Sequence, residues 1–266
     1  MFGIKSVYFY LIAFQITSVK FLKRIYFSSS RYNKSLETNT PKQAHYNPNS
    51  FLLSIITPYK AKSFKISEVD PSLFWIEDKK KDYKKLHSFF WLNLIDRKTD
   101  NKNIKKIIYI WMLKNSKYEK DIWAVSTLSS RVISWILNID IILNNATFEF
   151  KQNFLNSIIS QTNHLKKNIK FEEDYLKKIE MFTTLILSGL VFKEYEENYK
   201  LGIKELEDHI GKFFDNDGFP LTRNPGDLFF STKYLIFCKE IIKDAQIYIP
   251  EFLDNIIEKN LACLDF

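Results

Sequence analysis

The sequence predicts an all-α protein built from antiparallel helical hairpins. From about Asp82 onward, apolar residues recur at the helical period, and short polar breaks separate the periodic pieces. The 266 residues include only six glycines, too few for a glycine-turned β-sandwich or barrel or for phosphate-binding loops. Hydrophobic residues make up 45% of the chain and aromatic residues 16%, a composition typical of proteins that fold around a buried core.

The N-terminal segment, MFGIKSVYFYLIAFQITSVKFLKRIYF, is predicted to form a short helix. Its uncharged run from Ser6 to Val19 is interrupted by Gln15, Thr17 and Ser18 and is too short for a comfortable membrane span. The favoured interpretation is an aromatic helix that packs on the body or lies at a membrane surface. An uncleaved signal anchor and a cleaved signal stay open as alternatives, although no small-x-small cleavage site follows. Location is therefore unassigned, with a periplasmic or membrane-associated protein slightly favoured over a cytoplasmic one.

Residues 28–50 are polar and indicate a linker or irregular arm. We therefore divide the chain into an N-terminal helix and linker over residues 1–50 and a helical domain over residues 51–266. The first part of this domain, FLLSIITPYKAKSFKISEVDPSLFWIE, has short β-rich pieces interrupted by Pro58 and Pro71.

The helical domain is predicted to contain eight helices. They cover residues 82–97, 102–117, 124–144, 148–169, 173–194, 198–214, 227–246 and 250–264. Turn residues such as Asn144-Asn145 and Asp217-Gly218 mark the breaks. Helices with short connections form antiparallel hairpins, and the absence of a fixed-period repeat disfavours tetratricopeptide and HEAT arrays. Periodicity alone leaves an irregular bundle, a solenoid and a ring of hairpins as alternatives.

Ordered sequence motifs choose among these architectures. RVISWILNIDIIL (131–143) has Arg131 and Trp135 one turn apart, and QTNHLKKNIKFEEDYLKKIEMFTTLILSGLVF (161–192) begins with Gln161 and ends in Ser-Gly-Leu-Val-Phe. LEDHIGKFFDNDGFPLTRNPGDLFF (206–230) contains an Asp-Gly turn followed by Arg-Asn-Pro. In this order the motifs resemble landmarks of the heparinase II/III family of polysaccharide lyases. The aromatic stretch LHSFFWLNLI (86–95) is similar to the family's entry helix.

The resemblance covers roughly residues 50–266 and implies an incomplete (α/α) toroid. It also implies β-elimination on a polysaccharide that contains uronic acid, so the expected partner is an acidic polysaccharide. The family normally continues into a β-sandwich domain, which this sequence does not contain. The resemblance therefore implies a β-sandwich domain encoded downstream as a further partner.

Two signatures of the family's active members are missing. An Asn-His pair is replaced by the stretch Tyr175-Leu176-Lys177, and Gly226-Asp227 follow Pro225 where the family has a tyrosine. A lyase needs a group that neutralises the carboxylate, a base for the C5 proton and an acid for the leaving oxygen. The assignment as an enzyme is therefore open, and Tyr175 is a weak catalytic candidate, with helix packing as the alternative.

Five residues are predicted to bind substrate. Arg223 and Asn224 lie in the loop after the Asp-Gly turn and suit carboxylate and hydroxyl partners; the alternative is a surface ion pair for Arg223 and a helix cap for Asn224. Arg131, Trp135 and Trp123 combine an arginine with aromatic platforms that suit sugars. The alternative is core packing for the tryptophans and, for Arg131, a snorkelling side chain whose charged end reaches water.

The remaining side chains predict neither a metal site nor a cofactor. Cys238 and Cys263 are too few for a disulfide framework, and the four histidines lack ligand spacing. The net charge of +8 comes mostly from scattered lysines, so nucleic acid is not an expected partner, although a polyanionic ligand is compatible. A non-catalytic carbohydrate-binding toroid and a helical interaction domain are the alternatives to a lyase.

Overall fold

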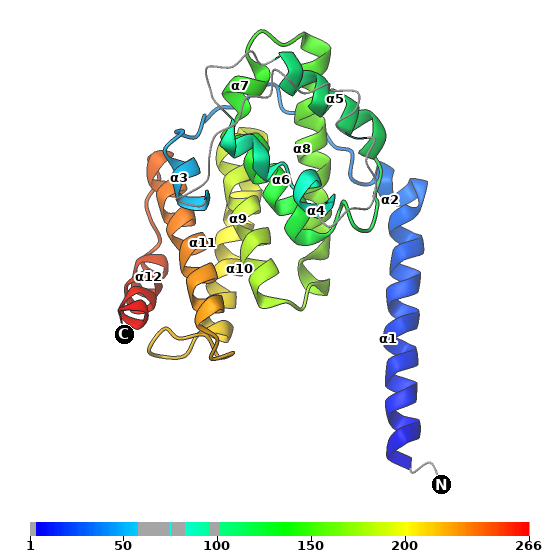
Figure 1. Ribbon diagram of the computed structural model, residues 1–266, viewed down its shortest axis with the longest axis vertical. Helices are drawn as coiled ribbons and strands as arrows, with labels where there is room; N and C mark the ends of the chain where they lie inside the picture. The colour runs from blue at the N-terminus through cyan, green and yellow to red at the C-terminus, as the bar shows by residue number, and fades with distance from the viewer. Residues whose placement is uncertain (1–3, 58–74, 76–82, 96–101, 266) are drawn as a thin grey trace.

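The computed structural model describes residues 4–57, 75, 83–95 and 102–265. Within these ranges every named element is a helix, and the helices form an incomplete (α/α) toroid, as Figure 1 shows. The predicted all-α class and toroid architecture are therefore confirmed.

The chain runs through twelve α-helices and three short 3-10 helices in its described part. These are α1 (Ile4–Ser28), α2 (Ser30–Lys34), α3 (Leu52–Ile56), α4 (Tyr83–His87), η1 (Phe90–Leu94), α5 (Lys102–Asn115), α6 (Val125–Leu137), α7 (Ile139–Leu143), α8 (Phe148–Asn168), η2 (Ile169–Phe171), α9 (Tyr175–Val191), η3 (Lys193–Tyr195), α10 (Glu196–Phe213), α11 (Pro225–Asp244) and α12 (Glu251–Leu264).

Two predicted helices are each split in the structure. The helix predicted over 82–97 ends at His87, because Phe89 takes a left-handed backbone with a φ of 55° before η1 begins. The Phe89 ring is fully buried against Trp111 and Trp135, and its burial offsets a backbone cost on the order of 1 kcal/mol. The helix predicted over 124–144 breaks at Asn138, whose side-chain amide donates to the Ser134 carbonyl at 2.8 Å.

The polar arm after α1 packs on the body along its length. Tyr32 is buried, and its hydroxyl lies 2.8 Å from Nδ1 of His164 on α8. Farther along, the His45 amide donates to the Val191 carbonyl at 2.9 Å. The Tyr46 hydroxyl and the Asn49 amide then both donate to the Asp244 carboxylate at the end of α11. The arm thus joins the start of the chain to its last hairpin.

The segment after the arm differs in part from the prediction. Short β-rich pieces were expected over residues 51–77, but Leu52–Ile56 form the helix α3, which packs on α11. Most of the remaining segment, including Pro58 and Pro71, lies outside the described residues.

The toroid has an inner row and an outer row of helices. Inner helices α6, α9 and α11 contact one another in that order, and the helices α8, α10 and α12 pack behind them. Each outer helix returns the chain, so the three inner helices run parallel and begin at the same end, the lower end in Figure 1. That end therefore gathers three helix N-termini, with their positive dipole ends.

Helix α1 stands apart from this body. In Figure 1 it projects beside the toroid, joined to it through its C-terminal turns. Phe27, in the last turns, is buried between the rings of Tyr32 and Tyr118. In the described part of the chain, none of the helices has both the length and the apolarity that crossing a bilayer requires.

Glycine allows the closest helix contact, between α9 and α10. A β-carbon at Gly189 would lie 2.2 Å from the backbone nitrogen of Tyr199, and one at Gly202 would lie 2.8 Å from Ile186. Both glycines sit inside helices, where they cost about 1 kcal/mol relative to alanine. Their small size outweighs this cost by letting the two backbones touch.

We expect Gly189→Ala to lower the free energy of unfolding by about 3 kcal/mol or more, because the backbone of Tyr199 cannot yield without separating α9 from α10. The matched control is Gly211→Ala in α10, where an added β-carbon meets nothing within 4 Å. It should raise the stability by up to about 1 kcal/mol. Urea denaturation of both variants measures the difference, and equal midpoints would contradict this account of the contact.

Candidate functional site

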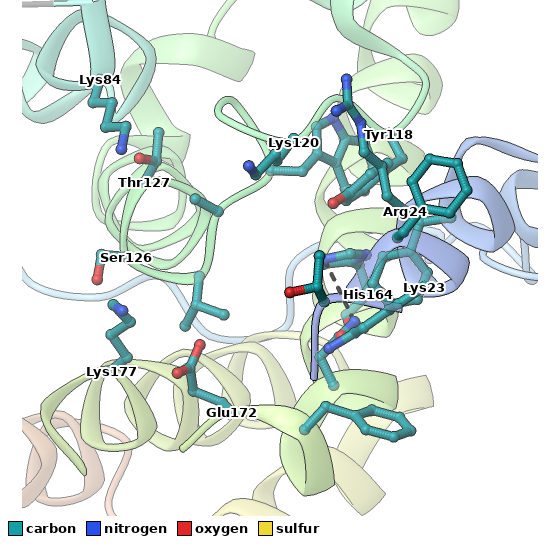
Figure 2. A pocket seen from close by; sticks show the side chains of 18 residues that line it. Lys23, Arg24, Lys84, Tyr118, Lys120, Ser126, Thr127, His164, Glu172 and Lys177 are labelled. Carbon is teal, nitrogen blue, oxygen red and sulfur yellow. Dashed lines mark hydrogen bonds between the residues drawn. The ribbon is translucent and has the colours of Figure 1, made fainter. Parts of the chain in front are cut away.

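A cleft opens at the end of the toroid where α6 and α9 begin. Its cavity has a volume of about 580 Å³ and lies between these helices, the C-terminal part of α8 and the last turns of α1. Side chains from both sides point toward its open centre in Figure 2. Those labelled there are Lys23, Arg24, Lys84, Tyr118, Lys120, Ser126, Thr127, His164, Glu172 and Lys177.

Positive charge dominates this cleft. The cations come from separate segments: Lys23 and Arg24 from α1, Lys84 from α4, Lys120 from the loop before α6, and Lys177 from α9. Glu172 is the one carboxylate among the described lining residues. Part of the charge is already paired, since Lys177 contacts Asp174 at 3.1 Å.

The N-terminus of α6 adds to this positive charge. Ala124 precedes the helix and has no side chain that caps it. The first-turn residues Val125, Ser126 and Thr127 line the cavity. The positive end of the α6 dipole therefore faces the same space as the lysine side chains, an arrangement that favours a bound anion.

An aromatic wall closes the cleft on the α8 side. The His164 ring contacts the rings of Phe27, Tyr118 and Trp123 at centroid distances of 5.4 Å. Burial, with the nearby cation Lys23, lowers the pKa of His164 from 6.5 to about 3. His164 is thus neutral near pH 7 and serves as a packed, hydrogen-bonded part of the wall.

A buried acid lies behind the α6 side of the cleft. The Tyr234 hydroxyl on α11 donates to Oε1 of Glu180 on α9 at 3.2 Å, and Ser126 also bonds Glu180. Burial raises the pKa of the Glu180 carboxyl. We did not single out Glu180 from the sequence, although it is the only acid in the apolar stretch 179–192. That isolation was the available signal, because a lone acid on an apolar helix must find partners.

Arg131 is fully buried in the core. Its Nε donates to Oε1 of Gln161 at 2.6 Å, and its Nη1 donates to the carbonyls of His87 at 2.7 Å and Ile122 at 3.1 Å. The guanidinium also lies 4.4 Å from the centroid of the Trp111 ring. With 0% of its surface exposed, Arg131 cannot touch a sugar in this conformation. Nor does its charged end reach water, as the snorkelling alternative expected, because core groups supply its hydrogen-bond partners.

The two tryptophans predicted to bind sugar differ in position. Trp135 is fully buried, with its ring edge-on to Trp111 at 5.3 Å, so it has the same core environment as Arg131. Trp123 is also buried, but it lines the cleft, and its Nε1 donates to the Asn115 carbonyl at 3.3 Å. Trp123 is therefore the one of the five predicted binding residues that the structure brings to the described cavity.

Arg223 and Asn224 lie in the loop that precedes α11. The Arg223 side chain, 65% exposed, pairs with Asp215 at 2.6 Å. Asn224 caps α11 by accepting the Gly226 amide at 2.9 Å. The alternative of an ion pair and a helix cap is confirmed. Neither residue lines the described cavity, although the loop and the cleft share the end of the toroid where the inner helices begin.

Tyr175 is the first residue of α9, also at this end. Its ring stacks on Phe213 at 5.4 Å and lies 5.3 Å from the His209 ring, while 44% of the residue remains exposed. The packing expected as the alternative is present, although the residue is only partly covered by it.

The histidine, cysteine and acidic side chains of the described residues lie apart from one another. No group of three or more histidine, cysteine, aspartate or glutamate side chains there could hold a metal ion. Cys238 is buried against Thr183, and burial raises the pKa of its thiol to about 12. Such a thiol is an inert core residue.

A comparison with solved structures gives a structural likeness. No protein-family model matches the chain, and a search of curated proteins finds no match. The fold is similar to the crystal structure of heparan sulfate lyase HepC from Pedobacter heparinus, with a TM-score of 0.58 and 17% sequence identity. The similarity covers 88% of this chain and 42% of that one, so this chain spans less than half of the neighbour's length. At this identity the likeness shows the fold alone.

We expect stability to fall below about pH 6.5 because three buried histidines stay neutral in the fold. Burial lowers the pKa of His87 and His209 from 6.5 to about 4 and that of His164 to about 3. As the pH falls from 6.5 toward these values, the unfolded chain binds protons that the folded chain does not. Each histidine then removes up to about 1.4 kcal/mol of stability per pH unit.

Urea denaturation at about pH 7.5 and about pH 5 measures this loss. His164→Gln and His209→Gln should each make the free energy of unfolding less dependent on pH. A wild-type stability that is equal at the two pH values would contradict the neutral state of these rings.

Proposed function

We propose that this chain is the toroid portion of a heparinase II/III-like polysaccharide lyase and that its cleft binds an acidic, uronate-containing polysaccharide. The observation that supports this most is the set of cations around the cavity at the N-terminus of α6. A uronate polymer presents a carboxylate on each acidic sugar, so it can contact several lysines and the helix N-terminus together. Tyr118, with the buried Trp123 ring behind it, supplies the aromatic surface that sugar rings favour.

Cleavage would require further chemistry from the same end of the toroid. In β-elimination a base removes the C5 proton, the C4–oxygen bond breaks, and an acid protonates the departing oxygen. The lysines and the α6 dipole suit neutralisation of the carboxylate, which makes the C5 proton more acidic. Tyr175 remains the weak candidate for a phenol. Glu180 and Tyr234 exchange a hydrogen bond behind Ser126, but both are buried.

A non-catalytic carbohydrate-binding toroid is the second candidate function. The observation that favours it is Asp227, which stands in the region where the family has its tyrosine. Its carboxylate accepts hydrogen bonds from Thr222 at 2.7 Å and from Asn224 at 2.9 Å. These contacts stabilise the start of α11. The position therefore holds a helix-capping acid where the family has a phenol.

Binding of a uronate polymer tests the proposal directly. We expect the chain to bind polygalacturonate but not neutral dextran. Lys84→Gln combined with Lys120→Gln should weaken binding about ten-fold or more, because each lost charge-assisted contact is worth about 1 to 3 kcal/mol. Lys200→Gln is the matched control, since it removes a lysine from the exposed face of α10, where Lys200 pairs with Glu196. Titration by fluorescence or calorimetry measures the affinities.

Equal weakening by the control, or equal binding of dextran, would contradict a specific cleft. The same samples report on catalysis through the ultraviolet absorbance of an unsaturated product. We expect none from this chain, because the family's Asn-His and tyrosine signatures are missing. Turnover would overturn the non-catalytic alternative and show that the chain holds its own acid and base.

Arg223 gives a separate prediction for the loop before α11. A polymer that extends from the cleft along the N-terminal ends of the inner helices would meet Arg223, whose partner Asp215 holds it near the start of α11. We expect Arg223→Ala to weaken polygalacturonate binding about ten-fold. The fold should survive, since an exposed ion pair contributes about 0 to 1 kcal/mol. Unchanged affinity in a folded variant would show that Arg223 only stabilises the loop, through its ion pair with Asp215.

A further inference from the structure

Helix α1 has an apolar face that is largely exposed in the described chain. Six of its exposed large side chains form this face: Tyr10, Leu11, Phe14, Phe21, Leu22 and Ile25, each more than half exposed. At 100° per residue these six fall on one side of the helix. Tyr8, Phe9, Val19 and Tyr26 are also more than half exposed, on other sides of the helix. Lys23 and Phe27 fall on the side opposite the apolar face and Arg24 at its margin. These three residues line the cleft, together with Phe21 at the edge of the apolar face. An exposed apolar surface of this size marks an interaction site.

The spacing of this face suits a flat surface. Tyr10, Leu11 and Phe14 are followed eleven residues later by Phe21, Leu22 and Ile25. Three turns of an α-helix take about 10.8 residues, so an eleven-residue period keeps the apolar row almost straight. A heptad period, by contrast, drifts and winds two helices into a left-handed coiled coil. The spacing therefore gives a nearly straight apolar row, which suits a plane, rather than the seam of a left-handed coiled coil.

The attachment of α1 sets the orientation of this face. Phe27 is buried among Tyr32, Tyr118 and His164, and the Lys23 ammonium lies 4.6 Å from the centre of the Phe171 ring. These contacts hold the C-terminal turns of α1 on the toroid. From this attachment the helix projects beside the body (Figure 1), and most of its apolar face stays exposed.

The charge of α1 identifies the plane. The helix contains Lys5, Lys20, Lys23 and Arg24 and no acidic residue. Lys23 and Arg24 line the cleft, so Lys5 and Lys20 are the cations that remain for lipid phosphates. Two such helices side by side would repel each other, whereas the phosphates of anionic lipids complement the charge. Tyrosine and phenylalanine are also favoured at the boundary between headgroups and acyl chains.

We propose that α1 binds the surface of an anionic lipid membrane, with Tyr10, Leu11, Phe14, Phe21, Leu22 and Ile25 inserted at the headgroup boundary. The toroid is then held beside the membrane, because the basic side of the same helix packs on it. This role is separate from polysaccharide binding and does not depend on it.

Vesicle flotation of the full chain tests the proposal. We expect binding to vesicles of phosphatidylglycerol and phosphatidylcholine at least about ten-fold tighter than to phosphatidylcholine alone. Leu11→Glu combined with Phe14→Glu, at positions 62% and 72% exposed, should weaken vesicle binding about 100-fold. The matched control is Leu113→Glu combined with Phe148→Glu, which makes the same changes at 65% and 79% exposed positions on α5 and α8. It should bind vesicles as the wild type does.

Three results would overturn the assignment. They are equal binding to neutral and anionic vesicles, equal loss in the control pair, and α1-dependent self-association by sedimentation without vesicle binding. Polygalacturonate affinity of the Leu11→Glu and Phe14→Glu variant should stay at the wild-type value. Since both positions are exposed, urea denaturation should confirm that this variant is folded. These measurements distinguish a loss of membrane binding through α1 from a loss of polysaccharide binding in the cleft.

Discussion

The cleft end of the toroid depends on the contacts of the buried Arg131 guanidinium. Removing a cation from water costs several kcal/mol, and here the partners are neutral: the carbonyls of His87 and Ile122, the Gln161 amide and the face of Trp111. These partners come from α4, α5, α8 and the loop before α6. Arg131 therefore fixes that loop, which positions Trp123 and Lys120 at the cavity.

The positive character of the cleft follows from the connectivity of the fold. Because every outer helix returns the chain, α6, α9 and α11 must all begin at one end. Their dipoles add there to side chains such as Lys84 and Lys177, which come from different hairpins. Mutual repulsion of these charges is tolerated because the side chains are solvated at the rim. A bound polyanion would relieve that repulsion.

Helical periodicity was sufficient to predict most helices but not their breaks or the cleft. Burial of the Phe89 ring, a tertiary effect, overrides local propensity and ends α4 early. Arg131 and Trp135 share a helix face as predicted, yet α6 is packed on several sides, so spacing cannot distinguish its core side from its cleft side. Lys23, Lys84 and Lys120 are distant in sequence, and only the tertiary fold brings them together. The loop over residues 217–225 could be predicted from the sequence because its turn and helix-capping residues act on their immediate neighbours in the chain.

The hydrogen bond between Tyr46 in the arm and Asp244 on α11 affects the order in which the protein folds during synthesis. These two residues are 198 positions apart. A ribosome that adds about 5 to 20 residues per second makes the second partner roughly 10 to 40 s after the first. Until then the arm and α3 lack their docking surface on α11, and their apolar side chains are open to chaperones. Docking of the arm and α3 on α11 is therefore a late step in folding. Contacts between residues so far apart in the sequence also slow folding.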